Sequence, residues 1–160
     1  MTNLGLTIEL WFDNEAEEAA RFYTGVFKDS ELGAIRYYTT DTPSNKPIGS
    51  VITVDFTLNG QRFQALNGGP DFKFNESISF IVECEDQAEI DYYWSKLTAD
   101  GGEESFCGWL KDKYGVSWQI VPKGLDDLLY QEDAAKGKRA MDVLLTMKKL
   151  DFEAIKVAAA

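Results

Sequence analysis

The side chains that carry out most enzymatic chemistry are unevenly represented in this chain. It contains no histidine, two cysteines (Cys84 and Cys107), and 27 acidic against 16 basic residues. Serine and cysteine nucleophile systems need an imidazole base, and the usual zinc and non-haem iron sites need imidazole ligands. The composition therefore excludes those catalytic centres within one chain.

The glycine motifs that bind phosphates are missing as well. Neither GxGxxG nor GxxxxGK[ST] occurs among the 160 residues, so no dinucleotide turn or P-loop is expected. The net charge of −11 is opposite in sign to that of nucleic-acid binders. No apolar run approaches the roughly 20 residues of a membrane-spanning helix, and the first residues lack a signal-peptide pattern. We expect a soluble cytoplasmic protein with reduced thiols and no nucleic-acid or membrane partner.

The elements that must position any site follow from hydrophobic periodicity and turn signals. In the first half we expect strands and one helix at 6–12, 15–27 (helix), 34–40, 51–58 and 61–66. In the second half we expect a strand, a helix and a hairpin at 77–84, about 87–100 (helix), 104–110 and 116–121. Asn59-Gly60 is the preferred pair for a type I′ hairpin turn.

The second half repeats the plan of the first half in its residues. The segment 60–66, with Phe63-Gln64, parallels the segment 115–121, with Trp118-Gln119. The helix-start pair Asn14 and Glu17 likewise has a counterpart in Asp86 and Glu89, and each pair predicts an N-cap with its return partner. Together these matches favour a duplicated β-α-β-β-β module.

The chain after residue 124 is predicted to be helical. Leucines at 125, 128 and 129 form one short face, the stretch 138–150 carries an amphipathic stripe, and 151–160 predicts a further short helix. We expect this tail to pack on its own sheet. The alternative is that its apolar stripe docks a partner protein.

Four stretches of the sequence form recognisable motifs: LWFDN at 10–14 with its following helix, SISFIVECED at 77–86, CGWLKDKYGVSWQIVP at 107–122, and MKKLD at 147–151. Together they resemble the PhnB-like, demethylubiquinone-methyltransferase-like family. The resemblance covers about residues 5–157, and the third stretch is the most specific. The family belongs to the vicinal oxygen chelate superfamily, together with the glyoxalases, bleomycin-resistance proteins and extradiol dioxygenases.

The resemblance implies an α+β fold in which two βαβββ modules form a cupped mixed sheet around a pocket. We expect one glyoxalase-like domain over 1–160, with module 1 at about 5–68, module 2 at about 75–122 and a helical tail at 123–160. The resemblance also implies a homodimer.

The superfamily's metal enzymes take ligands from the first and last strands of each module. The last-strand position, usually glutamate, holds Gln64 and Gln119 here, and the first-strand positions fall near Ile8 and near Ser77 or Ser79. A neutral amide is a poor ligand for a divalent cation compared with a carboxylate. We therefore expect a pocket without a metal ion or another cofactor.

Strand alternation predicts which side chains line that pocket. If Gln119 points inward, Ser117 does too, while Trp118 and Ile120 face the helix layer. By the same alternation, Gln64 points inward with Arg62 and Leu66. The candidate ligand-binding residues are Trp11, Arg62, Gln64, Ser79, Trp109, Ser117 and Gln119.

Each of these residues also has a structural interpretation. Arg62 is either an anion clamp or, as we favour, a rim residue, and Trp109 could equally belong to the core. The glutamine amides could instead satisfy strand ends or a dimer seam. On the first strand, periodicity alone leaves the facing open, and the family's aromatic at Trp11 favours Glu9 and Trp11 facing the pocket.

Two residues are weak candidates for catalysis. Glu9 could act as an acid or base if burial raises its pKa, and Cys107 could be a reactive thiol if a nearby cation lowers its pKa. An inert thiol is the favoured interpretation of Cys107.

Three functions therefore compete. The favoured one is a metal-free protein that binds a small organic molecule. The second is an enzyme performing the methyl transfer that the family description implies, or lyase-type chemistry. The third is a protein-interaction module acting through a dimer surface.

Overall fold

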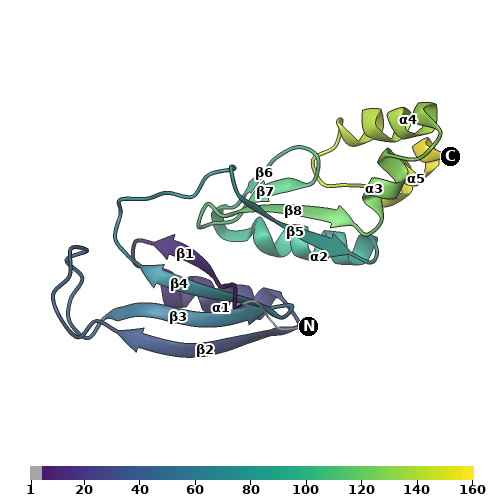
Figure 1. Ribbon diagram of the computed structural model, residues 1–160. Coiled ribbons are helices and arrows are strands. Elements are labelled where there is room, and N and C mark those ends of the chain that lie inside the picture. Colours follow the sequence, from purple (N-terminus) through teal and green to yellow (C-terminus); the bar gives the residue numbers. More distant parts are fainter. Residues whose placement is uncertain (1–4) are drawn as a thin grey trace. The chain divides into compact units, whose positions relative to one another are not determined.

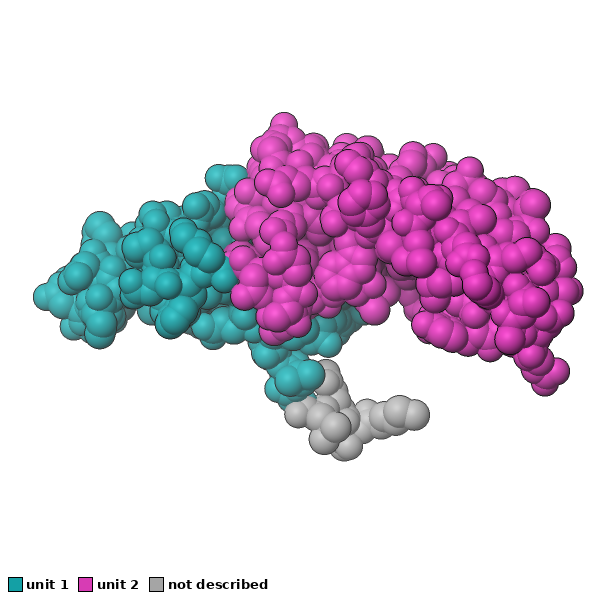
Figure 2. Space-filling model, turned by 90° about the horizontal axis from the view of Figure 1, so that it is seen from above, with its two compact units in different colours: residues 1–73 teal, residues 74–160 magenta. Residues whose placement is uncertain are grey.

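Each half of the chain folds into one β-α-β-β-β module. The computed structural model describes residues 5–160, and the chain divides into unit 1 (Met1–Lys73) and unit 2 (Phe74–Ala160), coloured separately in Figure 2. The signal-peptide expectation concerns residues that lie partly outside the described range. Among the described residues, no helix is long and apolar enough to cross a membrane.

Unit 1 contains one four-stranded sheet, here called sheet 1, and one helix (Figure 1). Its elements are β1 (Ile8–Phe12), α1 (Ala16–Val26), β2 (Ser30–Tyr37), β3 (Val51–Leu58) and β4 (Gln61–Asn67). The strand order is β1-β4-β3-β2, with β1 parallel to β4 and the other pairs antiparallel.

Unit 2 repeats this plan and adds the helical tail. Its elements are β5 (Ser79–Cys84), α2 (Gln87–Leu97), a 3₁₀ turn (Ala99–Gly101), β6 (Glu103–Glu104), β7 (Trp109–Lys111), β8 (Ser117–Pro122), α3 (Leu125–Leu129), α4 (Ala134–Leu144) and α5 (Phe152–Ala159). Sheet 2 has the order β5-β8-β7-β6, again with its first and last strands parallel. The duplication predicted from the sequence is confirmed.

In each unit the helix covers one face of the sheet and forms the core with it (Figure 1). In unit 1, Tyr23 of α1 stacks on Phe56 of β3, which stacks on Phe63 of β4, with ring centroids 6.0 and 5.1 Å apart. In unit 2, Ile90 and Leu97 of α2 are fully buried, as are residues of β7 and β8 at the same face. Alternate strand residues face away from the helix; we call that side the open face of each sheet.

The predicted hairpin turn is confirmed. Asn59 and Gly60 take φ values of 48° and 77°, the two positive angles that a type I′ turn requires. Leu58 and Gln61 on either side of them are paired across the two strands. This turn fixes the register of β3 against β4 and with it the face on which Gln64 lies.

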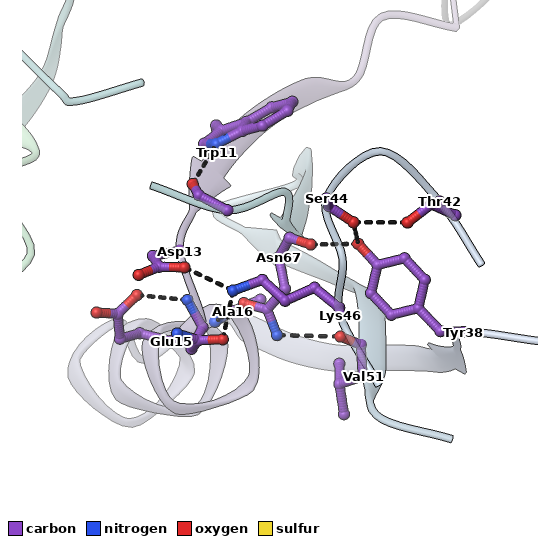
Figure 3. A network of polar contacts seen from close by, with 12 residues as sticks. Trp11, Asp13, Glu15, Ala16, Tyr38, Thr42, Ser44, Lys46, Val51 and Asn67 are labelled. Atoms are coloured by element: carbon purple, nitrogen blue, oxygen red, sulfur yellow. Dashed lines mark hydrogen bonds and ion pairs between the residues drawn. The ribbon is translucent and has the colours of Figure 1, made fainter. Parts of the chain in front are cut away.

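The predicted cap of the first helix is wrong. In the second helix Asp86 is the N-cap as predicted, but the Glu89 carboxylate accepts from Glu85 N–H, at 3.0 Å, one residue before the cap. In α1, Ala16 N–H donates to Asn67 Oδ1 of β4 at 2.8 Å, and Asn14 instead accepts from Lys46 Nζ at 2.6 Å (Figure 3). In α2, Asp86 Oδ1 accepts from Glu89 N–H at 2.9 Å. A residue 51 positions away in sequence thus replaces the local cap.

The strand expected at 104–110 is interrupted, leaving the short β6 and β7. Cys107 and Gly108 take positive φ values of 59° and 83°, and their N–H groups donate to the carbonyls of Met147 and Lys148, both at 2.8 Å. The tail therefore takes hydrogen bonds that a continuous strand would have made within the sheet.

The turn before β8 is organised by a buried aspartate. Asp112 Oδ1 accepts from the N–H groups of Tyr114 and Val116, and its Oδ2 accepts from Trp118 Nε1 at 2.8 Å. The turn-forming role expected for Asp112 is confirmed, and Trp118 faces the helix layer as predicted.

The tail packs within unit 2, as expected. A buried cluster joins its helices, formed by Ala140, Leu144, Leu150, Ile155 and Ala159. Val121 of β8 and Cys107 pack against this cluster, so it is continuous with one end of sheet 2. Gln87 fastens the tail to α2, because its Nε2 donates to Leu150 O at 3.0 Å and its Oε1 accepts from Phe152 N–H at 2.9 Å.

Candidate functional site

The open face of sheet 2 brings together four of the candidate residues. Gln119 of β8 pairs with Ile81 of β5 on one side and with Trp109 of β7 on the other. One step along, Ser117 pairs with Ser79 and Lys111. Side chains at these positions share one face because alternate residues of a strand point the same way. The expected facing of β8 is therefore confirmed.

A hollow of about 420 Å³ lies around Gln119 on this face. Its apolar lining comes from β5, β8 and α3, and it is formed by Ile81, Val121, Pro122 and Leu125. Three carboxylates, those of Glu83, Asp126 and Asp127, also line it, and no basic side chain does. The volume lies within the range of about 300–1,000 Å³ that is typical of small-molecule sites.

Gln119 is held in place by a side-chain hydrogen bond. Its Nε2 donates to Ser79 Oγ at 2.9 Å, across the parallel pair of β5 and β8. This bond fixes the amide plane and directs its carbonyl oxygen, which can accept a hydrogen bond from a ligand. Ser79 thus acts on the site by positioning Gln119.

The remaining two candidates of unit 2 line a second, smaller hollow. Trp109 and Ser117 border a space of about 140 Å³ further along the same face. Ser117 is almost fully buried and Trp109 is half-buried. These two candidates therefore lie at a different hollow from the one around Gln119, and the two hollows share no lining residue.

The open face of sheet 1 carries the other candidates. Glu9 pairs with Gln64 and Trp11 pairs with Leu66, so β1 presents Glu9 and Trp11 on the face that Arg62 and Gln64 share. The resemblance favoured Glu9 and Trp11 on the same face as Gln64, and this is the arrangement found. Glu9 and Arg62 are both exposed.

Gln64 is engaged in an ion-pair network of its own sheet. Its Nε2 donates to Asp55 Oδ1 at 2.7 Å, and Arg36 pairs with Asp55 Oδ2 at 2.8 Å. Burial raises the pKa of Asp55, but the hydrogen bonds from Gln64 and Arg36 outweigh it and hold that pKa below its ordinary value. Gln64 is therefore part of a row of hydrogen-bonded polar side chains that crosses β2, β3 and β4.

Trp11 is fixed against the end of its own sheet. Its Nε1 donates to Gly69 O at 2.9 Å (Figure 3), and its ring meets Phe72 edge-on with centroids 4.9 Å apart. A Cβ at Gly68 would come within 2.3 Å of the indole ring, so only glycine allows this approach. The half-buried ring has a fixed place on the open face of sheet 1.

The two cysteines lie in apolar surroundings. Burial, with added repulsion from Glu89 and Asp86, raises the pKa of Cys84 to about 12, so this thiol stays protonated at neutral pH. Cys107 is half-buried and packs against the tail cluster at its left-handed turn. Its role as a reactive thiol stays a prediction.

The residues at the superfamily's metal positions do not fit a divalent cation. They are Ile8 and Gln64 in unit 1, and Ser77 or Ser79 with Gln119 in unit 2. The side-chain amide nitrogens of both glutamines already donate to partners within their own sheets. An amide and a hydroxyl are weak ligands for a divalent cation, and the carboxylates that line the Gln119 hollow do not form a metal-binding group with each other. Among residues 5–160, no group of three or more histidine, cysteine, aspartate or glutamate side chains is arranged to hold a metal ion.

The sequence did not identify every residue around Gln119. Ile81 and Glu83 follow Ser79 at intervals of two on β5, so the period of a strand could have found them. Leu125, Asp126 and Asp127 reach the hollow only because α3 turns back beside β8, and no local pattern signals this.

Comparisons with known proteins agree with the fold. The 3-demethylubiquinone-9 3-methyltransferase family matches residues 5–121. The PhnB protein of Bacillus cereus, provisionally assigned as a 3-demethylubiquinone-9 3-methyltransferase, is 38% identical, with a TM-score of 0.65 over 74% of this chain and 98% of that chain. The comparison with curated proteins gives no match.

More distant solved structures share the fold alone. Protein PA1353 of Pseudomonas aeruginosa is 18% identical, with a TM-score of 0.59 over 75% of this chain and 98% of that chain. The fosfomycin resistance protein FosX of Listeria monocytogenes is 16% identical, with a TM-score of 0.53 over 79% of this chain and 97% of that chain. The paired βαβββ-like modules form a glyoxalase-like fold. From the match over residues 5–121 and the 38% identical relative, the chain belongs to the PhnB-like 3-demethylubiquinone-9 3-methyltransferase family.

Proposed function

We propose that this protein binds a small organic molecule in the hollow around Gln119, without a metal ion. The observation that carries the proposal is the hollow itself, about 420 Å³, lined by apolar side chains, three carboxylates and one oriented amide. Such a site selects a ligand by shape and by one or two hydrogen bonds.

The donor set supports the metal-free part of the proposal. A chelating site would need anionic or imidazole ligands on the first and last strands, where this chain has Ser79 and Gln119. Their mutual hydrogen bond of 2.9 Å also uses the serine oxygen that would have to face an ion. The same pair suits a ligand that donates a hydrogen bond to the Gln119 carbonyl.

The test is thermal-shift screening of the full chain against aromatic, quinone-like and phosphonate compounds, in buffer containing EDTA. We expect at least one class to raise Tm, with dissociation constants then measured by isothermal titration. Gln119→Leu keeps the side-chain size and removes the amide, so it should weaken binding by about tenfold, the equivalent of one hydrogen bond of about 1.4 kcal/mol.

Gln64→Leu is the matched control, since it removes the equivalent amide of sheet 1. It should leave the dissociation constant unchanged. The site assignment is contradicted if Gln119→Leu binds like wild type or if Gln64→Leu loses binding. The metal-free assignment is contradicted if EDTA abolishes binding, and the binding function itself is contradicted if no compound raises Tm.

Methyl transfer is the second candidate, favoured by the family description that matches residues 5–121. In that reaction a methyl group would pass from a sulfonium donor to a phenolic oxygen, which loses its proton, and the donor would leave as a thioether. Glu9, exposed on the open face of sheet 1, is the candidate base. Mass spectrometry of a demethylated quinol incubated with S-adenosylmethionine and the protein distinguishes the two: methylated product supports the enzyme, and unchanged quinol supports binding alone.

A further inference from the structure

Ser117 is a buried hydroxyl whose hydrogen-bonding capacity is not met. Its side chain is 1% exposed, and its Oγ has no hydrogen-bond partner within the described part of the chain. Most buried polar atoms in proteins are paired, because an unpaired one loses water without gaining a replacement. An orphaned hydroxyl therefore points to a group that the protein receives from outside.

Ser117 is one of the residues that line the smaller of the two hollows on sheet 2. This space of about 140 Å³ is lined by Glu76, Glu103, Glu104, Ser105, Trp109, Leu110, Lys111 and Ser117. It exceeds the roughly 30 Å³ that one water molecule occupies in the liquid. The hollow therefore has room for several water molecules or for one small organic group.

The lining of this hollow is negatively charged. Lys111 Nζ forms an ion pair with Glu76 Oε1, so the one ammonium group of the lining is already neutralised. Glu104 Oε1 accepts a hydrogen bond from Trp94 Nε1 at 2.8 Å. Glu103 stands opposite Lys111 across the β6–β7 pair and adds a further carboxylate. Glu104 pairs with the buried Leu110 and turns its carboxylate to Trp94 of α2, which leaves two carboxylates, those of Glu76 and Glu103, against one ammonium group. This balance favours a cationic occupant.

We infer that this hollow binds the protonated amino group of a small organic cation. An ammonium N–H donates to Ser117 Oγ, Glu103 supplies the counter-charge, and the Trp109 ring offers an aromatic surface that attracts cations. An anion of the same size lacks a free positive partner there, since Lys111 is paired with Glu76.

This inference does not rest on the proposed function. The Gln119 hollow and the Ser117 hollow have no lining residue in common. Loss of either site therefore leaves the other measurable.

The test is a ¹H–¹⁵N NMR titration of the full chain at neutral pH, following the indole N–H of Trp109, which a Trp109→Phe spectrum identifies. The probes are propylammonium and, as its anionic counterpart of similar size, propionate. We expect a saturable shift of the Trp109 signal with propylammonium that weakens as ionic strength rises. No shift with propylammonium, or an equal shift with propionate, overturns the inference.

Two variants separate the hydroxyl from the charge. Ser117→Ala and Glu103→Gln should each raise the apparent dissociation constant of propylammonium by about tenfold or more. Glu132→Gln, which removes an exposed carboxylate outside the hollow, is the charge-matched control and should bind like wild type.

The Ser117→Ala variant also carries its own folding control. Because it removes an unpaired buried hydroxyl, its Tm should equal or exceed that of wild type. Unchanged propylammonium binding in both variants overturns the inference. So does a Tm loss in Ser117→Ala without the probe, since that would show a partner for the hydroxyl within the protein.

Discussion

Units 1 and 2 have the same strand order and differ in what surrounds the matched glutamines. Gln64 of β4 and Gln119 of β8 each lie on a last strand that runs parallel to the first. Gln64 donates to Asp55, which Arg36 also binds, so its polar partners form a chain across three strands. Gln119 has Ser79 as its partner and lies beside a hollow.

The difference comes from the elements that follow each module. In unit 2, α3 turns back at Gly124, which has a φ of 77°, and its residues complete the wall of the hollow beside β8. In unit 1, the segment after β4 packs instead on Trp11 of β1, through contacts with Gly68 and Phe72. A duplicated backbone thus provides two open faces, and the segments that follow each module give the matched glutamines different surroundings.

The largest expected effect concerns the tail that distinguishes unit 2. Leu150 is fully buried in the tail cluster, so Leu150→Ala should lower the free energy of unfolding by about 3 kcal/mol. Urea denaturation measures it. Leu145→Ala, at a leucine that is 56% exposed, is the control and should change stability by less than about 0.5 kcal/mol. Equal effects of the two would show that the tail cluster does not stabilise unit 2.

A smaller effect compares how the two helices begin. Asn67 is buried; its Oδ1 caps Ala16 and its Nδ2 donates to Val51 O at 3.1 Å (Figure 3). Asn67→Ala leaves both groups without this partner and should cost about 2 kcal/mol. Asp86→Ala removes a local cap and should cost about 1 kcal/mol. Urea denaturation midpoints compare the two variants. A lower midpoint for Asp86→Ala than for Asn67→Ala would show that the long-range cap is not the stronger one.

The smallest effect is the pH dependence of the Asp55 network. Because the pKa of Asp55 is held below its ordinary value of 3.8, the stabilisation is present above that value and is lost as pH falls through the lowered pKa. The Tm difference between wild type and Asp55→Asn should therefore narrow as pH drops from 6 towards about 3. Asp41→Asn, at an exposed position, is the control and should show a constant difference. A gap that stays constant for Asp55→Asn would contradict the network's role.

Hydrophobic periodicity predicted much of this structure, because each helix and strand buries its residues at regular intervals along the sequence. The hairpin at Asn59-Gly60 and the facing of Gln119 both follow from local geometry. The cap from Asn67 and the break at Cys107 do not, since each depends on a segment distant in sequence. The residues of α3 that line the hollow could not be predicted for the same reason, since they depend on how a later segment packs. No strand pattern shows that Ser117 lacks a hydrogen-bond partner.

The account depends most on unit 2 presenting the binding face, and ¹H–¹⁵N NMR of the full chain with a panel of phenols and methoxyphenols tests this directly. The account predicts that the shifts gather on Ile81, Glu83 and the side-chain amide of Gln119, while the amide of Gln64 does not move. Shifts confined to the open face of sheet 1 or to the tail helices, or none with any compound of the panel, would contradict it.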